Sequence, residues 1–256
     1  MGSTRAPILE VRSLSKRFGG LTAVSELDFE VREGEILGMI GPNGAGKSTT
    51  FNLIAGTYPA SSGEVLFKKE PILGLPPHGI AARGILRTFQ HNRPFEGMPV
   101  IDNVLVGAHT RFRLNLFGKK SKNEEQERRH RAEELIEFVG LAGLAQADVG
   151  TLSFGQGRLL EIARALAGEP RLILFDEPAA GLAPAELDRL AEIIRGIAAR
   201  GIAVLLIEHD MHFLLPLAHR VVVLNFGAKI ADGLPDDIRR NPAVMDAYLG
   251  SHAPHS

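Results

Sequence analysis

Residues 41–49, Gly-Pro-Asn-Gly-Ala-Gly-Lys-Ser-Thr, have the types and spacing of a loop that binds phosphate groups. The glycines allow backbone N–H groups to approach phosphate oxygens closely. Lys47 can bring an ammonium group to the β- and γ-phosphates, and the Ser48 hydroxyl can bind Mg²⁺. An apolar strand expected at residues 36–40 and a helix expected at residues 50–55 disfavour an ordinary glycine-rich turn. The predicted nucleotide-binding residues of this loop are Gly41, Asn43, Gly44, Ala45, Gly46, Lys47, Ser48 and Thr49.

Two adjacent acids, Asp176 and Glu177, end an apolar run that is typical of a buried strand. Asp176 is placed to hold Mg²⁺, directly or through water. Glu177 is a candidate for orienting and polarising an attacking water. Such a pair can also mark a simple turn at a strand end. The phosphate loop upstream favours hydrolysis of a nucleoside triphosphate instead.

The composition is that of an ordinary soluble globular chain. The 256 residues are 45% hydrophobic and 23% charged, with a net charge of −1, so nothing indicates a broad nucleic-acid-binding surface. The chain has no cysteine, which excludes disulfides and thiol catalysis and fits a reducing cytosol. The longest apolar runs, such as residues 203–207, fall far short of the ~20 residues that span a bilayer. We therefore expect any membrane role to come through a partner.

The elements that must position these residues mix strands and helices, as in an α/β layer. Strands are expected at residues 8–11, 27–31, 36–40, 64–67, 85–90, 171–177, 203–207, 221–225 and 229–232. Helices are expected at residues 100–107, 124–139, 158–167, 184–199 and 242–249, with Asn123 as the cap of the second. The helical middle third predicts a subdomain inserted into the α/β layer.

Five motifs occur in the order found in ABC-type ATPases, and the resemblance covers essentially the whole chain. They are the phosphate loop, Gln90, Leu-Ser-Phe-Gly-Gln at residues 152–156, the strand that ends in Asp176 and Glu177, and His209. The resemblance implies one ABC ATPase domain with the P-loop NTPase fold, a RecA-like core with an antiparallel β subdomain and an inserted α-helical subdomain. The implied boundaries are about 1–97 and 168–235 for the core, 98–167 for the helical subdomain and 236–256 for a C-terminal extension.

The resemblance also implies roles for residues that mean little in isolation. Phe18 would stack on adenine, Gln90 would reach Mg²⁺ and the water and sense the transport partner, and His209 would contact the γ-phosphate. The implied catalytic residues are Glu177, His209, Lys47 and Gln90. The implied Mg²⁺ ligands are Ser48, Gln90 and Asp176.

Ser153, Gly155 and Gln156 match the family's signature motif. A serine, a glycine and a helix N-terminus together can form a second anion site. Because one phosphate loop already binds the nucleotide, we interpret this site as facing the γ-phosphate of another subunit, in a head-to-tail pair with two ATP molecules between the subunits. Two departures from the family pattern are Phe154, where glycine is commonest, and the absence of an acid in residues 178–183.

A finer resemblance is to the ATP-binding subunits of branched-chain amino-acid importers, the LivG type. It rests on residues 87–90, 161–166, 176–182, 207–211 and 241–250, and on the extra segment at residues 111–122. It implies a peripheral ATPase at the cytoplasmic face of the inner membrane that uses ATP and Mg²⁺. The implied partners are a second ABC ATPase subunit (a copy or a homologue), integral permease subunits and, indirectly, an extracytoplasmic solute-binding protein, with no nucleic acid.

Three other functions stay open at this point. The ATPase of the lipopolysaccharide exporter is similar in several of the same places. A soluble ABC ATPase acting on DNA or ribosomes would usually carry a long coiled coil or tandem ATPase domains. A monomeric P-loop kinase would need an acceptor pocket and would not explain the signature motif.

Overall fold

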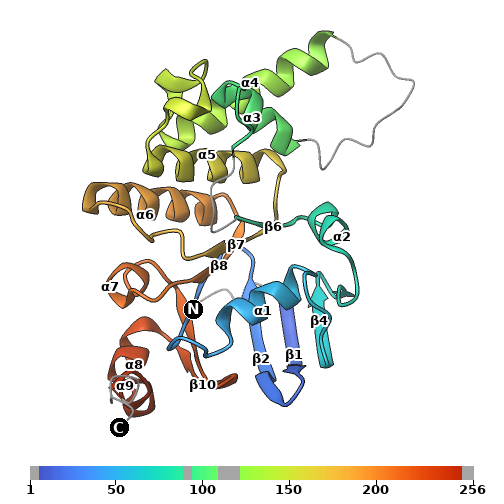
Figure 1. The fold of residues 1–256 in the computed structure, drawn as a ribbon, viewed down its shortest axis with the longest axis vertical. Helices are drawn as coiled ribbons and strands as arrows, with labels where there is room; N and C mark the ends of the chain where they lie inside the picture. Colours follow the sequence, from blue (N-terminus) through green and yellow to red (C-terminus); the bar gives the residue numbers. More distant parts are fainter. Residues whose placement is uncertain (1–5, 89–93, 109–121, 250–256) are drawn as a thin grey trace.

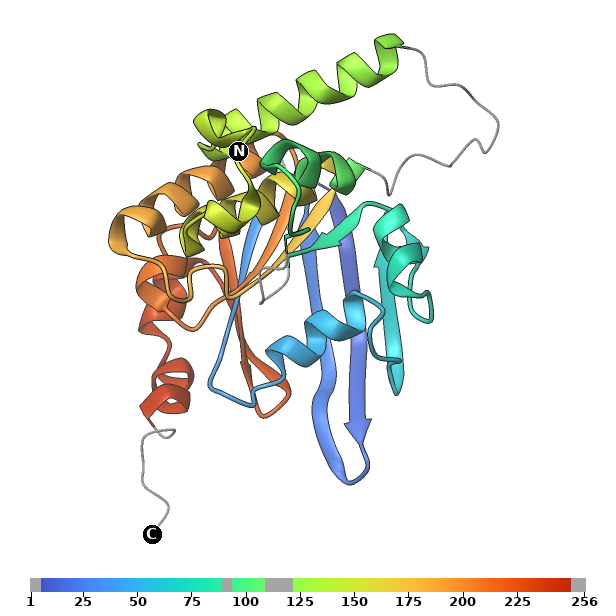
Figure 2. The ribbon, with the colours of Figure 1, turned by 45° about the horizontal axis from the view of Figure 1, so that its top comes forward.

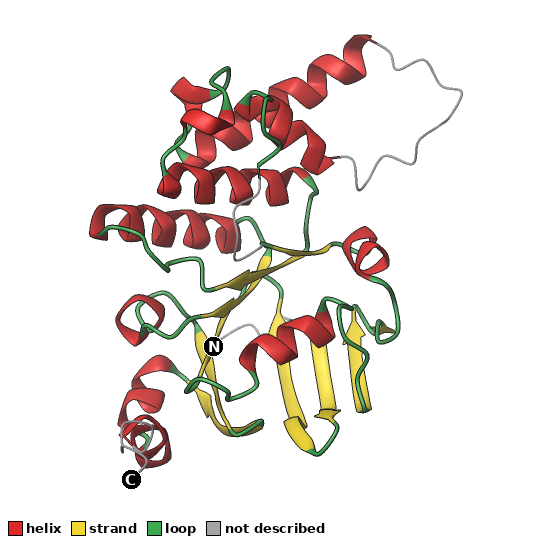
Figure 3. Cartoon of the chain, viewed as in Figure 1, coloured by secondary structure: helices red, strands yellow, loops and turns green. Residues whose placement is uncertain are grey.

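The computed structural model describes residues 6–88, 94–108 and 122–249. Figure 1 shows two sheets in one part of the molecule and the helices α3, α4 and α5 together in another, with α6 between them. Figure 3 separates the same elements by type. This mixture of parallel sheet, antiparallel sheet and grouped helices agrees with the expected α/β fold.

A six-stranded sheet, in the order β10-β9-β3-β8-β7-β6, forms the centre of the fold. All neighbouring pairs in it are parallel except β10 with β9. Every residue of β3, β7 and β8 is buried, as expected for parallel strands covered on both faces. The strand bounds are β3 Ile36–Ile40, β6 Ile85–Arg87, β7 Leu172–Asp176, β8 Ala203–Ile207, β9 Arg220–Asn225 and β10 Ala228–Gly233.

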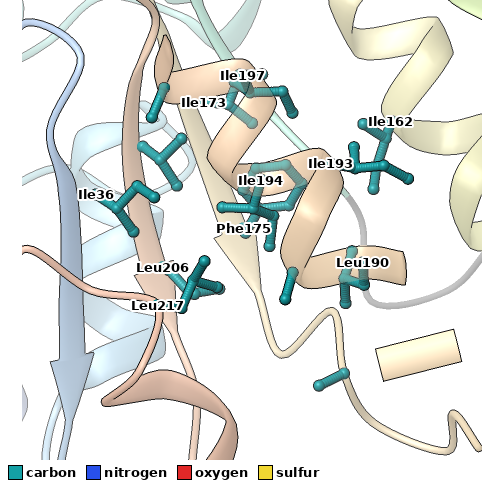
Figure 4. Packing of buried hydrophobic residues seen from close by; sticks show 14 of the residues in the cluster. Ile36, Ile162, Ile173, Phe175, Leu190, Ile193, Ile194, Ile197, Leu206 and Leu217 are labelled. Atoms are coloured by element: carbon teal, nitrogen blue, oxygen red, sulfur yellow. The ribbon is translucent and has the colours of Figure 1, made fainter. Parts of the chain in front are cut away.

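Side chains on these strands alternate between two apolar layers. In β3, Leu37 and Met39 join a cluster with α1 (Lys47–Ile54), whereas Ile36 and Ile40 join a cluster with α6 (Pro184–Ala199). Figure 4 shows part of the second cluster, including Phe175 from β7 and Ile194 from α6. The sheet is therefore held from both faces, and polar side chains can emerge only at its edges and strand ends.

A four-stranded antiparallel sheet, in the order β2-β1-β4-β5, covers the α1 layer. Its bounds are β1 Pro7–Phe18, β2 Leu21–Arg32, β4 Ser62–Phe67 and β5 Glu70–Pro71. The strands β1 and β2 form a hairpin much longer than the two short strands that alternation predicted, because the pairing continues to the turn at Gly19 and Gly20. Figure 2 shows this hairpin beside α1.

Three helices pack on one another outside the sheets: α3 Val100–Gly107, α4 Lys122–Val139 and α5 Phe154–Ala167. Their apolar faces share a cluster with α6 and the central strands, so the core is continuous between the helices and the sheet. The remaining helices are α2 Pro77–Ala82, α7 Met211–Leu214, α8 Pro235–Arg240 and α9 Pro242–Leu249, with 3₁₀ turns at Ala142–Leu144 and Val149–Thr151.

Several expected boundaries were wrong. β6 ends at Arg87 rather than at residue 90, and Asn123 lies inside α4 instead of capping it. α5 begins at Phe154, earlier than the expected residue 158, because Ser153 and Gln156 form a capping box that starts the helix. The short helices α2, α7 and α8 were not expected, since four to six residues carry little periodicity. Within the described ranges, no helix is both long enough and apolar enough to cross a membrane.

Candidate active site

The phosphate loop joins β3 to α1, and neighbouring backbone presses closely on it. A Cβ atom on Gly41 would lie 2.1 Å from the carbonyl oxygen of Leu224, and one on Gly46 would lie 2.5 Å from that of Ala23. Both positions therefore require glycine for space as well as for their positive φ. Around Gly44, by contrast, a Cβ would meet nothing within 4 Å. The loop is thus braced on one side and open where a phosphate group could enter.

Lys47, the first residue of α1, is buried and closes the loop on itself. Its Nζ donates hydrogen bonds to the carbonyl oxygens of Gly41 at 2.6 Å and Pro42 at 3.0 Å. Burial lowers the pKa of Lys47, and the carboxylates of Glu177 and Asp176 oppose part of that shift. The fold therefore brings this ammonium group within electrostatic reach of both acids, which lie about 130 residues later in the sequence.

Asp176 ends β7 and is buried, with 1% of the surface of the residue exposed. Its Oδ2 accepts a hydrogen bond of 2.5 Å from Arg87, the last residue of β6. Its Oδ1 is buried and has no hydrogen-bond partner among the described residues. A buried carboxylate needs a cation close by. Arg87 supplies it on one oxygen and leaves the other oxygen available.

Arg87 also holds α1, since its second terminal nitrogen donates to Oδ1 of Asn52 at 2.7 Å. One guanidinium group therefore ties together β6, β7 and the helix that follows the phosphate loop. Arg87 was not predicted to have this role. The available signal was a basic residue at the end of one parallel strand and an acid at the end of another.

Glu177 follows Asp176 in an unusual backbone conformation, with φ of +49°. The left-handed region costs a residue other than glycine about 1 kcal/mol. Its own N–H donates to the carbonyl oxygen of Ile207 at 3.0 Å, which anchors it to the end of β8. His209 lies two residues beyond Ile207, with its side chain 60% exposed. The residues expected to act on water and on the γ-phosphate therefore follow adjacent strand ends.

Comparison with protein families gives two matches along this chain. The model described as "ABC transporter" matches residues 24–180, which include the phosphate loop, the signature motif and both acids. The chain belongs to the ABC transporter family. A second model, described as "Branched-chain amino acid ATP-binding cassette transporter", matches residues 228–254 at the end of this ATPase.

Similar proteins cover nearly the full length of the cassette. The high-affinity branched-chain amino acid transport ATP-binding protein BraF of Pseudomonas aeruginosa is 45% identical over 250 residues, which is 95% of this chain and 98% of that protein. LivG of Escherichia coli (strain K12), which carries the same description, is 41% identical with the same coverage.

Solved structures of similar cassettes confirm the expected P-loop NTPase fold. The ADP conformation of MJ1267, an ATP-binding cassette of an ABC transporter, has a TM-score of 0.85 and 35% identity, and the match covers 96% of this chain and 99% of that one. The dimeric structure of MJ0796, a bacterial ABC transporter cassette, has a TM-score of 0.76 at 24% identity over 89% of this chain and 98% of that one, a likeness that shows the fold alone.

In this ABC ATPase, Phe18 stands at the end of β1 with 43% of its surface exposed. Its ring and the ring of Tyr58 form a T-shaped pair, with the two centroids 5.6 Å apart. Nζ of Lys16 lies 4.8 Å from the Phe18 centroid and donates to the carbonyl oxygen of Pro59 at 2.7 Å. Phe18 is thus an exposed but well-supported aromatic ring, a surface on which a base can stack.

The signature residues lie at the start of α5, in a different part of the molecule from the phosphate loop. Ser153 Oγ accepts from the N–H of Gln156 at 3.2 Å, and Gln156 Oε1 accepts from the N–H of Ser153 at 2.9 Å. A Cβ on Gly155 would lie 2.0 Å from Oε1 of Glu186, so any larger residue there would have to displace this side chain, which accepts a hydrogen bond from the N–H of Ala183 at the start of α6. Figure 1 shows α5 and α1 in separate parts of the molecule. Within one chain, Lys47 therefore lies near Asp176 and Glu177, whereas the signature residues lie away from these three residues.

Two expected features lie outside the described residues. They are Gln90 and nearly all of the extra segment at residues 111–122.

The pair of Arg87 and Asp176 predicts a strong effect on stability before any nucleotide binds. Arg87→Met should lower the free energy of unfolding by about 3 kcal/mol, because it leaves a buried carboxylate without its cation. Unfolding by urea in buffer without Mg²⁺ measures this free energy. Arg12→Met is the matched control, since Arg12 pairs with Glu10 and Glu64 while its side chain is 55% exposed. Equal losses in the two variants would contradict the inferred tie.

Proposed function

We propose that this chain hydrolyses ATP as the ATP-binding subunit of a membrane importer of branched-chain amino acids. The observation that carries the proposal is the convergence of Lys47, Asp176 and Glu177 at the phosphate loop. The branched-chain amino acid transport functions of BraF and LivG, and the match of residues 228–254 to the branched-chain amino acid family model, support an amino-acid substrate for the importer.

ATP would bind with its phosphates on Gly41–Thr49 and its base on Phe18. Mg²⁺ fits the residues present, because Asp176 has a buried oxygen without a partner among the described residues and Ser48 is exposed at the start of α1. The proposed ligands are Ser48, Asp176 and Gln90. The ion would supply charge neutralisation for the phosphate oxygens.

The side chains of this chain would then act by position and charge. Glu177 orients and polarises the water that attacks the γ-phosphorus, while Lys47 and His209 stabilise the charge on the γ-phosphate oxygens. Phosphoryl transfer passes through a loose transition state, so most of the rate enhancement comes from placement and electrostatics. Fixed backbone around Glu177 serves that placement.

A second subunit would complete the site. Ser153 is exposed at the start of α5, the helix that also carries Gly155 and Gln156, and Figure 1 shows α5 and α1 in separate parts of the molecule. From there the three residues would face the γ-phosphate held by another ATPase subunit. The proposed arrangement is a head-to-tail pair, either of two copies or of this chain with a homologue. The assembly would lie at the cytoplasmic face of the inner membrane, on integral permease subunits served by an extracytoplasmic binding protein.

The role of Glu177 predicts a separation of binding from turnover. Glu177→Gln should lower kcat for ATP hydrolysis by about a hundredfold or more, because the amide cannot polarise the water. ATP affinity should stay near that of the unmodified chain. Phosphate release and equilibrium binding of a fluorescent ATP analogue measure the two quantities. Hydrolysis at the original rate would remove Glu177 from this role.

The position of Ser153 predicts that its replacement harms the opposite site. Ser153→Arg should abolish hydrolysis while the isolated subunit keeps its affinity for ATP. Ser153→Ala is the matched control, since it removes the same helix cap without adding bulk or charge. Loss of ATP affinity in the isolated Ser153→Arg subunit would count against the two-subunit site.

The transport assignment predicts what this subunit carries with it from native membranes. The Glu177→Gln variant, held with ATP and purified from those membranes, should bring two integral permeases and a second, shorter ATPase, identified by mass spectrometry. A lipid-export assembly around two copies of this chain would contradict amino-acid import. Exclusively soluble partners would contradict transport altogether.

A further inference from the structure

Glu208 is a buried acid next to His209, and the proposed mechanism assigns it no role. It directly follows β8, and its surface is 0% exposed. The register of β7 with β8 pairs Asp176 with Ile207, so Glu177 and Glu208 occupy equivalent positions just beyond the two strand ends. The oxygens of a buried carboxyl group normally accept hydrogen bonds, and the donors of these bonds indicate the function of the group.

One oxygen of Glu208 holds the loop that carries Glu177. Oε1 accepts a hydrogen bond of 2.9 Å from the backbone N–H of Ala179. The N–H of Glu177 donates to the carbonyl oxygen of Ile207 at 3.0 Å. The segment from Glu177 to Ala179 is therefore attached to the end of β8 at both of its ends. These two bonds sustain the left-handed backbone of Glu177, which a free loop would relax.

The other oxygen of Glu208 faces His209. Oε2 is buried, has no hydrogen-bond partner among the described residues and lies 3.8 Å from Nδ1 of the His209 ring. On the far side of His209, Asp210 caps α7 by accepting from the N–H of His212 at 2.7 Å. The backbone of His209 is therefore held between a buried residue and a capped helix.

We propose that Glu208 is a positioning residue for ATP hydrolysis, which fixes the Glu177 loop through Ala179 and orients the ring of His209. The inference rests on the proposed function of these two residues. It makes the acid that acts on water and the histidine that acts on the γ-phosphate parts of one rigid unit. Motion of β8 relative to the phosphate loop would then move both residues together.

Substitutions of Glu208 can separate the effect of its hydrogen bond to Ala179 from the effect of its charge. Burial raises the pKa of Glu208 to about 7, while the hydrogen bond from Ala179 lowers it. A carboxylate, a neutral carboxyl group and an amide can all accept the Ala179 hydrogen bond through Oε1. Glutamine should therefore replace Glu208 with little loss, whereas leucine fills a similar volume and offers no acceptor.

The test compares Glu208→Gln with Glu208→Leu. Glu208→Leu should lower kcat by about tenfold or more with ATP affinity within about twofold, and Glu208→Gln should retain kcat within about threefold. In the Glu177→Gln background, Glu208→Leu should cause a clearly smaller loss than in the unmodified chain, because the part of its effect that passes through Glu177 is already gone. A wild-type kcat in Glu208→Leu, or equal losses in both variants, would overturn the proposal.

Glu35→Leu is the matched control for general damage. Glu35 is also a buried acid, paired with Arg220 at 3.0 Å, but it precedes β3 at the opposite end of the sheet. Its loss should lower thermal stability and leave kcat unchanged. A comparable fall in kcat here would mean that Glu208 acts only through stability.

A measurement without nucleotide keeps this inference separate from the ATPase assignment. Amide hydrogen exchange at residues 177–180 should accelerate in Glu208→Leu and stay near the unmodified rate in Glu208→Gln. Unchanged exchange in Glu208→Leu would refute the attachment even in an active enzyme. Protected amides in a chain that hydrolyses no ATP would instead refute the proposed function and leave the attachment standing.

Discussion

The candidate active site depends on the parallel pairing of strands that are buried on both faces. β3, β7 and β8 have no exposed residue, so their polar neighbours emerge only where the strands end. Parallel strands end at the same edge of a sheet, and ligands of α/β proteins bind there. The register of Asp176 with Ile207 then places the acids that follow β7 and β8 at equal height, beside the loop that follows β3.

Once gathered at this edge, the charges must be balanced without a nucleotide. Arg87 binds one oxygen of Asp176 and reaches Asn52 on α1, while Lys47 is held by the carbonyl oxygens of its own loop. These contacts fix Asp176 and the phosphate loop in place. Electrostatic catalysis benefits from such preorganisation, because the groups need not reorient during the reaction.

Backbone geometry rather than side-chain identity sets much of the remaining arrangement. Glu177 is held in a left-handed conformation by contacts with the end of β8, and Gly41 and Gly46 are pressed by neighbouring carbonyl groups. The signature helix, by contrast, packs with α3 and α4 and stays away from α1. A single chain therefore gathers most of the proposed nucleotide-binding residues, and the proposed pairing of two chains follows from where the signature residues lie.

The sequence alone determined the family, the strand–loop–helix around Lys47, and the buried strand that ends at Asp176 directly before Glu177, because glycine spacing and apolar periodicity are local signals. The helix Pro184–Ala199 was predicted with both ends correct, since proline marks its start. Only the tertiary structure decided the long β1–β2 hairpin, the tie from Arg87 to Asp176 and the place of Glu208. Those features join residues that are distant in sequence, and they arise from strand register and the need to pair buried polar groups, which no local pattern records.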